Sequence, residues 1–316
     1  MGKKLLIERC NQWGFFSSFL QVLDNLRWCE QNDYEIIIKW GNNGFGNGIN
    51  QSQYYSKNGY NGSDNVWEYY FEQISTDSPN VSETKDNFNQ FLLKEIPQNF
   101  GYRNIQTSGL RVKPDWNIVD DYWRKEANRL IKKYIKIKPN IVEKIDKFYN
   151  ENLDVDLKKI SVHLRGGRGA KELYHSDNVN LEYYRDCIND YLNKNKIKNY
   201  VIFVASDTNE AISFMIQNFK NVKSYPCYRT DDYYINGKPY EQVQEVGFNK
   251  SHNQFMPDKR AEIGEQALIE SQLLSKGDVM FHHDSLLAIA AANFNPNMSL
   301  MHIENFITGE TNEITK

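Results

Sequence analysis

The chain has 316 residues, which is enough for two domains of average size. Its hydrophobic share of 40% and aromatic share of 14% exclude a disordered chain. The formal net charge of -3 gives no support to binding of nucleic acid or of an anionic membrane surface, and no apolar run is long enough to predict a membrane span.

The cysteines and the N-terminal residues bear on the compartment. The four cysteines, Cys10, Cys29, Cys187 and Cys227, have no metal-ligand spacing, so we expect free thiols in a reducing compartment. The apolar run near the N-terminus is too short for a secretory signal. We therefore expect a cytoplasmic protein, and a peripheral association with a membrane stays open.

The first elements predict the opening of a parallel sheet. Apolar runs predict strands over residues 4–8 and 34–40, and helical spacing predicts a helix over 19–30 between them. Gly14 and Phe15 follow the first strand, at the edge where a ligand binds in such folds. They are candidates for an acceptor cleft, although a glycine there can simply turn the chain.

Two long segments, 41–63 and 226–258, are rich in tyrosine and polar residues. Loops of this length are often lids or binding loops, and their tyrosines could stack on sugar rings or only brace the loop. We assign no elements over residues 66–114.

The middle of the chain predicts two helices and a boundary. Residues 115–138 and 141–149 have helical spacing, and the polar stretch 150–159 follows. We place the domain boundary there, with an N-terminal α/β domain over 1–155 and a C-terminal α/β domain over 156–316.

The second half alternates strands and helices, which predicts an α/β fold with a parallel sheet. Strands are expected over 160–164, 200–205, 222–225, 278–281 and 300–303. Helices are expected over 180–193, from the stretch 206–210 to about 219, over 259–275 and over 285–293. Asp207, with Glu210 three residues later, forms a capping-box arrangement at the start of the second of these helices.

The stretch over residues 160–172 is the main candidate site. It predicts a strand that ends in a glycine-rich basic turn, with His163 and Arg165 on one face of the strand. Such a turn lets the backbone approach a ligand closely, and Arg165 and Arg168 supply positive charge. A diphosphate site and an ordinary basic surface turn both fit this stretch alone.

Three stretches in order carry a resemblance to a known family. They are 162–169 (VHLRGGRG), 203–208 (FVASDT) and 267–285 (ALIESQLLSKGDVMFHHDS). The first resembles the His-x-Arg motif of the GDP-fucose fucosyltransferases, above all the bacterial nodulation type that fucosylates chitin oligosaccharides. The other two resemble the second and third motifs of that family.

The resemblance implies a GT-B fold, in which two Rossmann-like domains face a cleft. It makes residues 1–155 the side of the acceptor, a glycan or lipid-linked glycan, and residues 156–316 the nucleotide-sugar-binding side. It also implies an inverting transfer of fucose from GDP-fucose to a glycan or glycoconjugate hydroxyl, without a metal. The donor-binding residues that it implies are His163, Gly167, Arg168, Ser206, Asp207, Thr208, Glu270, Asp284 and Ser285.

Carried over by position, these residues have separate roles. Arg165 would bind the β-phosphate, and Ser285, at a helix N-terminus, would hold a phosphate oxygen. Glu270 would contact the guanine, His163 would contact the guanine side or brace the loop, and Asp207 would shape the rim of the pocket.

The chemistry points to two catalytic candidates. Negative charge grows on the β-phosphate as the sugar leaves, and a fixed guanidinium stabilises that charge, so Arg165 is the catalytic candidate. Glu172 follows the turn and is the candidate base for the acceptor hydroxyl. A surface glutamate at a helix start is the alternative for Glu172.

The sequence also departs from the family. Gly166 stands where many relatives have a second arginine, Arg168 where some have aspartate, and Glu270 where aspartate is common. A same-fold transferase that uses another nucleotide sugar, or a non-catalytic sugar- or nucleotide-binding protein, therefore stays open.

Two further patterns contain residue types that can bind a metal, but neither predicts a metal site. Asp154 and Asp156 form a DxD pair, but they lie in a polar linker, where a chance match or a helix cap is the alternative. His282 and His283 are adjacent, so in a strand they would point to opposite faces. We expect no bound metal.

Overall fold

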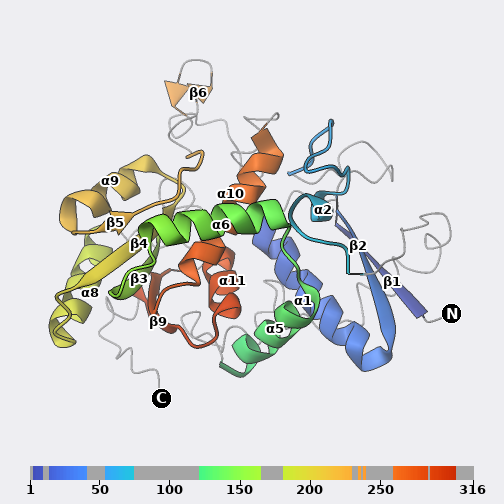
Figure 1. Ribbon diagram of the computed structural model, residues 1–316, viewed down its shortest axis with the longest axis horizontal. Coiled ribbons are helices and arrows are strands. Elements are labelled where there is room, and N and C mark those ends of the chain that lie inside the picture. Colours follow the sequence, from blue (N-terminus) through green and yellow to red (C-terminus); the bar gives the residue numbers. More distant parts are fainter. Residues whose placement is uncertain are drawn as a thin grey trace. The chain divides into compact units, whose positions relative to one another are not determined.

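A computed structural model describes residues 3–9, 14–40, 54–74, 121–164, 181–229, 234–235, 238–239, 259–283 and 285–303 (Figure 1). The chain divides into two compact units. Unit 1 comprises Met1–Val142 and Met256–Glu265, and unit 2 comprises Glu143–Phe255 and Gln266–Lys316. The roles predicted for residues 1–155 and 156–316, an acceptor side and a nucleotide side, stay predictions.

Unit 1 begins with the predicted strand, helix and strand. Strand β1 (Lys3–Arg9) pairs in parallel with β2 (Tyr34–Trp40), and α1 (Phe15–Asn32) connects them. The helix starts earlier than predicted because Phe15 and Phe16 extend its buried apolar face. It ends at Asp33, whose φ of 59° lies in the left-handed region and stops the helix.

A short helix in unit 1, α2 (Val66–Tyr70), falls in a region where the sequence allowed no assignment. Asn65 caps this helix by accepting from the backbone N–H of Trp67, and its side chain also accepts from the N–H of Trp40 at 2.9 Å. The Asn65 amide donates to the carbonyl of Ile38 at 2.9 Å. One side chain therefore fastens α2 to β2, which is a long-range contact that local sequence patterns do not reveal.

An aromatic core fills unit 1. The Phe15 ring packs edge-on against the rings of Tyr70 and Trp40, with centroid distances of 4.9 and 5.9 Å. The backbone N–H of Phe15 also donates to the hydroxyl of Tyr54 at 3.0 Å. These contacts bury Phe15, so its side chain packs in the core of unit 1, and its predicted place at an acceptor cleft stays a prediction.

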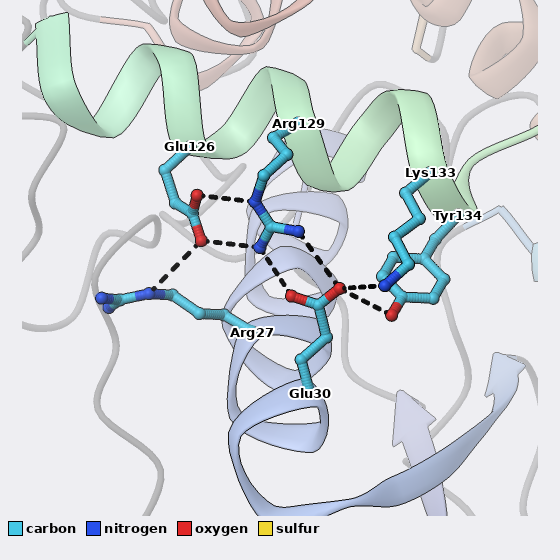
Figure 2. Close-up of polar contacts among 6 residues, drawn as sticks. All are labelled: Arg27, Glu30, Glu126, Arg129, Lys133 and Tyr134. Atoms are coloured by element: carbon cyan, nitrogen blue, oxygen red, sulfur yellow. Dashed lines mark hydrogen bonds and ion pairs between the residues drawn. The ribbon is translucent and has the colours of Figure 1, made fainter.

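Helix α5 (Asp121–Tyr134) packs on α1 through a charged network (Figure 2). Arg129 holds both carboxylate oxygens of Glu30, at 2.6 and 3.1 Å, while Lys133 and Tyr134 each donate to Glu30 Oε1 at 2.7 Å. The network comprises Arg27, Glu30, Glu126, Arg129, Lys133 and Tyr134. The hydrogen bond from Arg129 is the largest cause that lowers the pKa of Glu30, to about 2.

Unit 2 is built on a five-stranded sheet whose pairs are all parallel. Its strands are β3 (Lys158–Leu164), β4 (Tyr200–Ser206), β5 (Val222–Lys223), β8 (Val279–His282) and β9 (Ser299–His302). They lie in the order β5-β4-β3-β8-β9. This arrangement confirms the predicted α/β fold with a parallel sheet.

Helices pack on both faces of this sheet (Figure 1). They are α6 (Pro139–Asn152), α8 (Leu181–Lys194), α9 (Asn209–Asn218), α10 (Arg260–Leu274) and α11 (Leu286–Phe294). Ile160 and Val162 of β3 share a hydrophobic core with residues of α8 and α9. On the opposite face, the Ser161 hydroxyl donates to the carbonyl of Leu274 in α10 at 2.7 Å. The centre of the sheet is therefore buried from both sides, as its apolar strands predict.

Three smaller features complete the fold. Strands β6 (Tyr234–Ile235) and β7 (Lys238–Pro239) form an antiparallel pair inside the segment predicted as one long loop. Of the cysteines, Cys29, Cys187 and Cys227 are free thiols, and Cys10 lies outside the described residues. Within the described ranges, no helix has both the length and the apolar character needed to cross a bilayer.

Candidate functional site

Strands β3, β4 and β8 end at the same edge of the unit 2 sheet. In register, His163 lies opposite both Ala205 and His282, and Leu164 lies opposite Ser206. The carboxyl edge of a parallel sheet is where ligands bind in open α/β folds. The predicted residues Arg165, Gly167, Arg168, Glu172 and Asp284 lie outside the described residues.

His163 lies on the face of β3 that looks toward α10. Ile160 and Val162 pack against α8 and α9. Successive side chains of a strand point to opposite faces, so His163 points away from those helices. The side chain is 7% exposed, and the backbone carbonyl accepts from the hydroxyl of Tyr184 at 3.1 Å. The backbone at His163 is therefore tied to α8, and its side chain is buried at the edge of the sheet.

The turn after β4 differs in one detail from the predicted capping arrangement. The sequence suggested that Asp207 caps the next helix together with Glu210, but the cap of α9 is Thr208, whose hydroxyl accepts from the N–H of Ala211 at 3.3 Å. Ser206 accepts from the N–H of Thr208 at 3.3 Å and so tightens the turn. The helix starts one residue later than the capping box required, which leaves the half-buried Asp207 outside the cap.

The main feature that the sequence reasoning missed is a buried ion pair between Arg229 and Glu270. The Nη1 atom of Arg229 lies 2.7 Å from Oε1 of Glu270, and the two residues are only 4% and 6% exposed. The same Nη1 also donates to the carbonyl of Ser206, and Nη2 donates to the carbonyl of Tyr225 at 2.8 Å. The pair therefore lies at the carboxyl end of β4.

Opposing effects act on the Glu270 carboxyl. Burial is the largest and raises its pKa, while the positive charge and hydrogen bond of Arg229 lower it. A hydrogen bond with the Cys227 thiol also lowers the pKa of Glu270, and the nearby charge of Asp207 raises it. The net result is a pKa above the ordinary value, and Arg229 is the first of the causes that favour the carboxylate.

Ser285 occupies the position that the sequence predicted, at the start of a helix. Its hydroxyl accepts from the N–H of Leu287 at 3.3 Å and caps α11. This helix follows β8, so its N-terminus lies at the carboxyl edge of the sheet, where backbone N–H groups favour an anion.

A row of histidines crosses the same edge. His163, His282 and His302 are in register on β3, β8 and β9. The rings of His282 and His283 both lie beside the ring of His302, with centroid distances of 5.1 and 5.2 Å. The argument that His282 and His283 point to opposite faces was wrong, because β8 ends at His282 and its alternation does not extend to His283.

The environment of His282 favours the neutral ring. Burial is the largest cause that lowers its pKa well below the ordinary value, and the neighbouring His302 adds to this effect. Nδ1 of His282 lies 3.2 Å from the carbonyl of His283. In the part of the chain that the structure describes, no group of three His, Cys, Asp or Glu residues could hold a metal ion.

Two of the predicted features lie elsewhere. Asp154 and Asp156 are exposed and precede β3, at the end of the strand opposite to His163. Gly14 is exposed and precedes the first turn of α1 in unit 1, where its carbonyl accepts from the N–H of Ser18 at 3.2 Å.

The structure therefore brings part of the predicted site together within unit 2. The residues at the carboxyl edge are His163, Ser206, Asp207, Thr208, Glu270 and Ser285. Arg229 joins them, and one sequence signal could have pointed to it. Glu270 lies in the run 267–274 (ALIESQLL), where buried neighbours predict that its carboxyl needs a partner, but the sequence does not say which residue that partner is.

Comparisons with known proteins bear on the fold. No protein-family model matches the chain, and no curated protein matches it in sequence. A crystal structure of NodZ α-1,6-fucosyltransferase soaked with GDP-fucose is similar, with a TM-score of 0.55, 17% identity, and coverage of 94% of each chain. Fucosyltransferase NodZ from Bradyrhizobium is also similar, with a TM-score of 0.55, 17% identity and coverage of 96% of each chain.

At this identity the likeness shows the fold. NodZ co-crystallised with GDP gives a similar result, with a TM-score of 0.52, 16% identity and coverage of 94% of this chain and 93% of that one. The mixed α/β fold with a parallel sheet thus matches solved fucosyltransferase structures. The two-domain GT-B arrangement expected from the three sequence motifs stays a prediction.

Proposed function

We propose that this chain is a glycosyltransferase that moves fucose from GDP-fucose to a hydroxyl of a glycan or glycoconjugate. One observation carries the proposal. His163, the Ser206–Asp207–Thr208 turn, Glu270 and Ser285 belong to three separate sequence motifs, and they meet at one sheet edge in a fold that matches NodZ. The proposal includes a GT-B arrangement, an inverting reaction and no requirement for a metal.

The diphosphate is expected to bind beside the ends of β3 and β8. Arg165 directly follows the last residue of β3 in the chain, and Ser285 begins α11 after β8. A guanidinium binds phosphate oxygens through two parallel N–H groups, and a helix N-terminus adds backbone N–H donors. Together they would stabilise the charge that grows on the β-phosphate as the sugar leaves, more in the transition state than in the ground state.

The guanine is expected at the end of β4. A carboxylate only accepts hydrogen bonds, and guanine presents adjacent N–H donors, so ionised Glu270 suits that base. Glu270 is held at this edge by Arg229, which also binds the carbonyl of Ser206. The acceptor hydroxyl must lose a proton in the reaction, and Glu172 is the proposed base.

Ligand-induced stabilisation tests the proposal against its rivals. We expect GDP and GDP-fucose to raise the melting temperature of the full chain, and UDP, CDP and their sugars to leave it unchanged, because a bound ligand stabilises only the folded state. Stabilisation by UDP alone would overturn the assignment of GDP-fucose as the donor. Gly166 and Arg168, the least family-like residues of the glycine-rich turn, would then be the first residues to explain a different donor.

The same samples test the reaction. Slow release of fucose from GDP-fucose would separate an enzyme from a protein that only binds the nucleotide. We expect that release to persist in EDTA. Loss of release in EDTA and its recovery with Mn²⁺ would contradict the metal-independent mechanism and bring Asp154 and Asp156 back into consideration.

A further inference from the structure

Arg229 connects segments that are far apart in the sequence. Its guanidinium contacts Glu270 in α10, the carbonyl of Ser206 at the end of β4, and the carbonyl of Tyr225 after β5. The backbone N–H of the preceding residue, Tyr228, donates to Oε1 of Gln266 in α10 at 2.9 Å. The Arg229 guanidinium and the Tyr228 N–H thus fasten the segment after β5 to the sheet edge and to α10.

The surroundings of Glu270 make that cation decisive for its charge. Burial in a low-dielectric interior disfavours the carboxylate, and the negative charge of Asp207 opposes it further. Arg229 and the Cys227 thiol are the groups that favour the charged form. A thiol donates only a weak hydrogen bond, so most of the support comes from Arg229.

We infer that Arg229 is a positioning residue that keeps Glu270 ionised and oriented at the carboxyl end of β4, and that it thereby sets the preference of the site for a base with adjacent N–H donors. This inference rests on the proposed function. Arg229 acts through Glu270 and need not touch the nucleotide. A carboxylate has about four lone-pair positions, so the bond from Arg229 leaves capacity for a ligand.

The inference predicts a change in both base selectivity and pH dependence. When Glu270 becomes protonated, one acceptor turns into a donor that faces the N–H groups of guanine. Arg229→Met removes the positive charge that lowers the pKa of Glu270, so that pKa rises further. Binding of GDP should therefore weaken as the pH falls, and should do so at a higher pH in the variant than in the unaltered chain.

The test measures dissociation constants of GDP and IDP between pH 5 and 8 for the full chain and its variants. IDP lacks the 2-amino group of guanine, so the ratio of the two constants reports base reading. We expect Arg229→Met to weaken GDP binding about 10- to 100-fold at neutral pH, the range of a hydrogen bond to a charged group. The preference for GDP over IDP should fall with it.

Two further variants separate positioning from simple loss of folding. Arg124 is another buried arginine, 3% exposed and 3.1 Å from Asp121 in unit 1, so Arg124→Met is a matched control. It should lower the melting temperature but keep the GDP to IDP ratio and the pH profile. The double variant Arg229→Met with Glu270→Met should regain stability, because apolar side chains often replace a buried pair without loss, yet it should not regain base selectivity.

Melting temperatures measured without nucleotide distinguish a failure of the Arg229 inference from a failure of the proposed function. The inference requires that Glu270 ionises more readily in the unaltered chain than in Arg229→Met, so the melting temperatures of the two should converge at acid pH and diverge as the pH rises. An Arg229→Met protein with the pH profile and base ratio of the unaltered chain would overturn the inference. If the melting temperatures diverge as expected but the unaltered chain binds no GDP, the proposed function and the base-reading role are overturned. Only the effect of Arg229 on the ionisation of Glu270 would then stand.

Discussion

At the scale of single residues, Ser285 offers a test that separates folding from phosphate binding. Its side chain caps α11, and both Asn and Asp cap helices about as well as Ser. Ser285→Asn and Ser285→Asp should therefore melt close to the unaltered chain. The negative charge of Asp at a phosphate site should weaken GDP binding at least about tenfold, by repulsion between like charges, relative to the Asn variant.

The comparison of these two variants by calorimetric titration checks the prediction. Equal GDP affinities in the two proteins would mean that the diphosphate does not lie at the start of α11. A loss of stability in both would instead mean that the cap depends on the hydroxyl itself.

Individual site residues differ in how far the sequence reveals them. Ser285 could be predicted because a serine before an apolar helix is a local cap signal, and the structure confirms the cap. Arg229 could not, because its partner Glu270 lies 41 positions away and the two meet only when α10 packs beside the sheet. Pairing of buried charges is decided by tertiary packing, which one-dimensional spacing does not describe.

At the scale of elements, the charged network between α1 and α5 is expected to stabilise unit 1. Glu30 is its centre, with contacts from Arg129, Lys133 and Tyr134 (Figure 2). Its cations are half-exposed, so we expect Glu30→Gln to lower the free energy of unfolding by only about 1 kcal/mol at pH 7. Urea unfolding at low and high salt measures this difference, which should shrink at high salt.

The pH dependence of the same variant follows from the sign of the pKa shift. Glu30 has a folded-state pKa lowered to about 2 from 4.5, mainly by the hydrogen bond from Arg129. Its contribution to stability is therefore present above pH 4.5 and is lost as the pH falls toward 2. A stability difference between Glu30→Gln and the unaltered chain that persisted unchanged at pH 2 would contradict this account.

Elements were predictable where their signals are local. The strands of unit 2 are short apolar runs flanked by polar turns, and the structure places β3, β4, β8 and β9 where these runs occur. Helix α2 was missed because it has only five residues and depends on Asn65 contacts with β2. Contacts of that kind stabilise helices too short to form alone.

At the scale of the whole molecule, the order of strands and helices in the second half was enough to predict a parallel α/β sheet. The three motifs added a fucosyltransferase-type fold, which matches solved structures of NodZ. Strand order does not follow from the sequence alone, and it is this order that brings His163, Ser206 and Ser285 to one edge. The candidate site at that edge therefore depends on the sheet topology as well as on the sequence motifs.

The central claim is that this edge activates GDP-fucose, and the release of fucose from GDP-fucose by the full chain tests it most directly. The account predicts measurable release that Arg165→Ala lowers at least about 100-fold, because a positioned guanidinium stabilises the charge on the leaving diphosphate. Arg165→Ala should keep the melting temperature of the unaltered chain. Release by Arg165→Ala at the rate of the unaltered chain, or no release by the unaltered chain while it binds GDP-fucose, would contradict the claim.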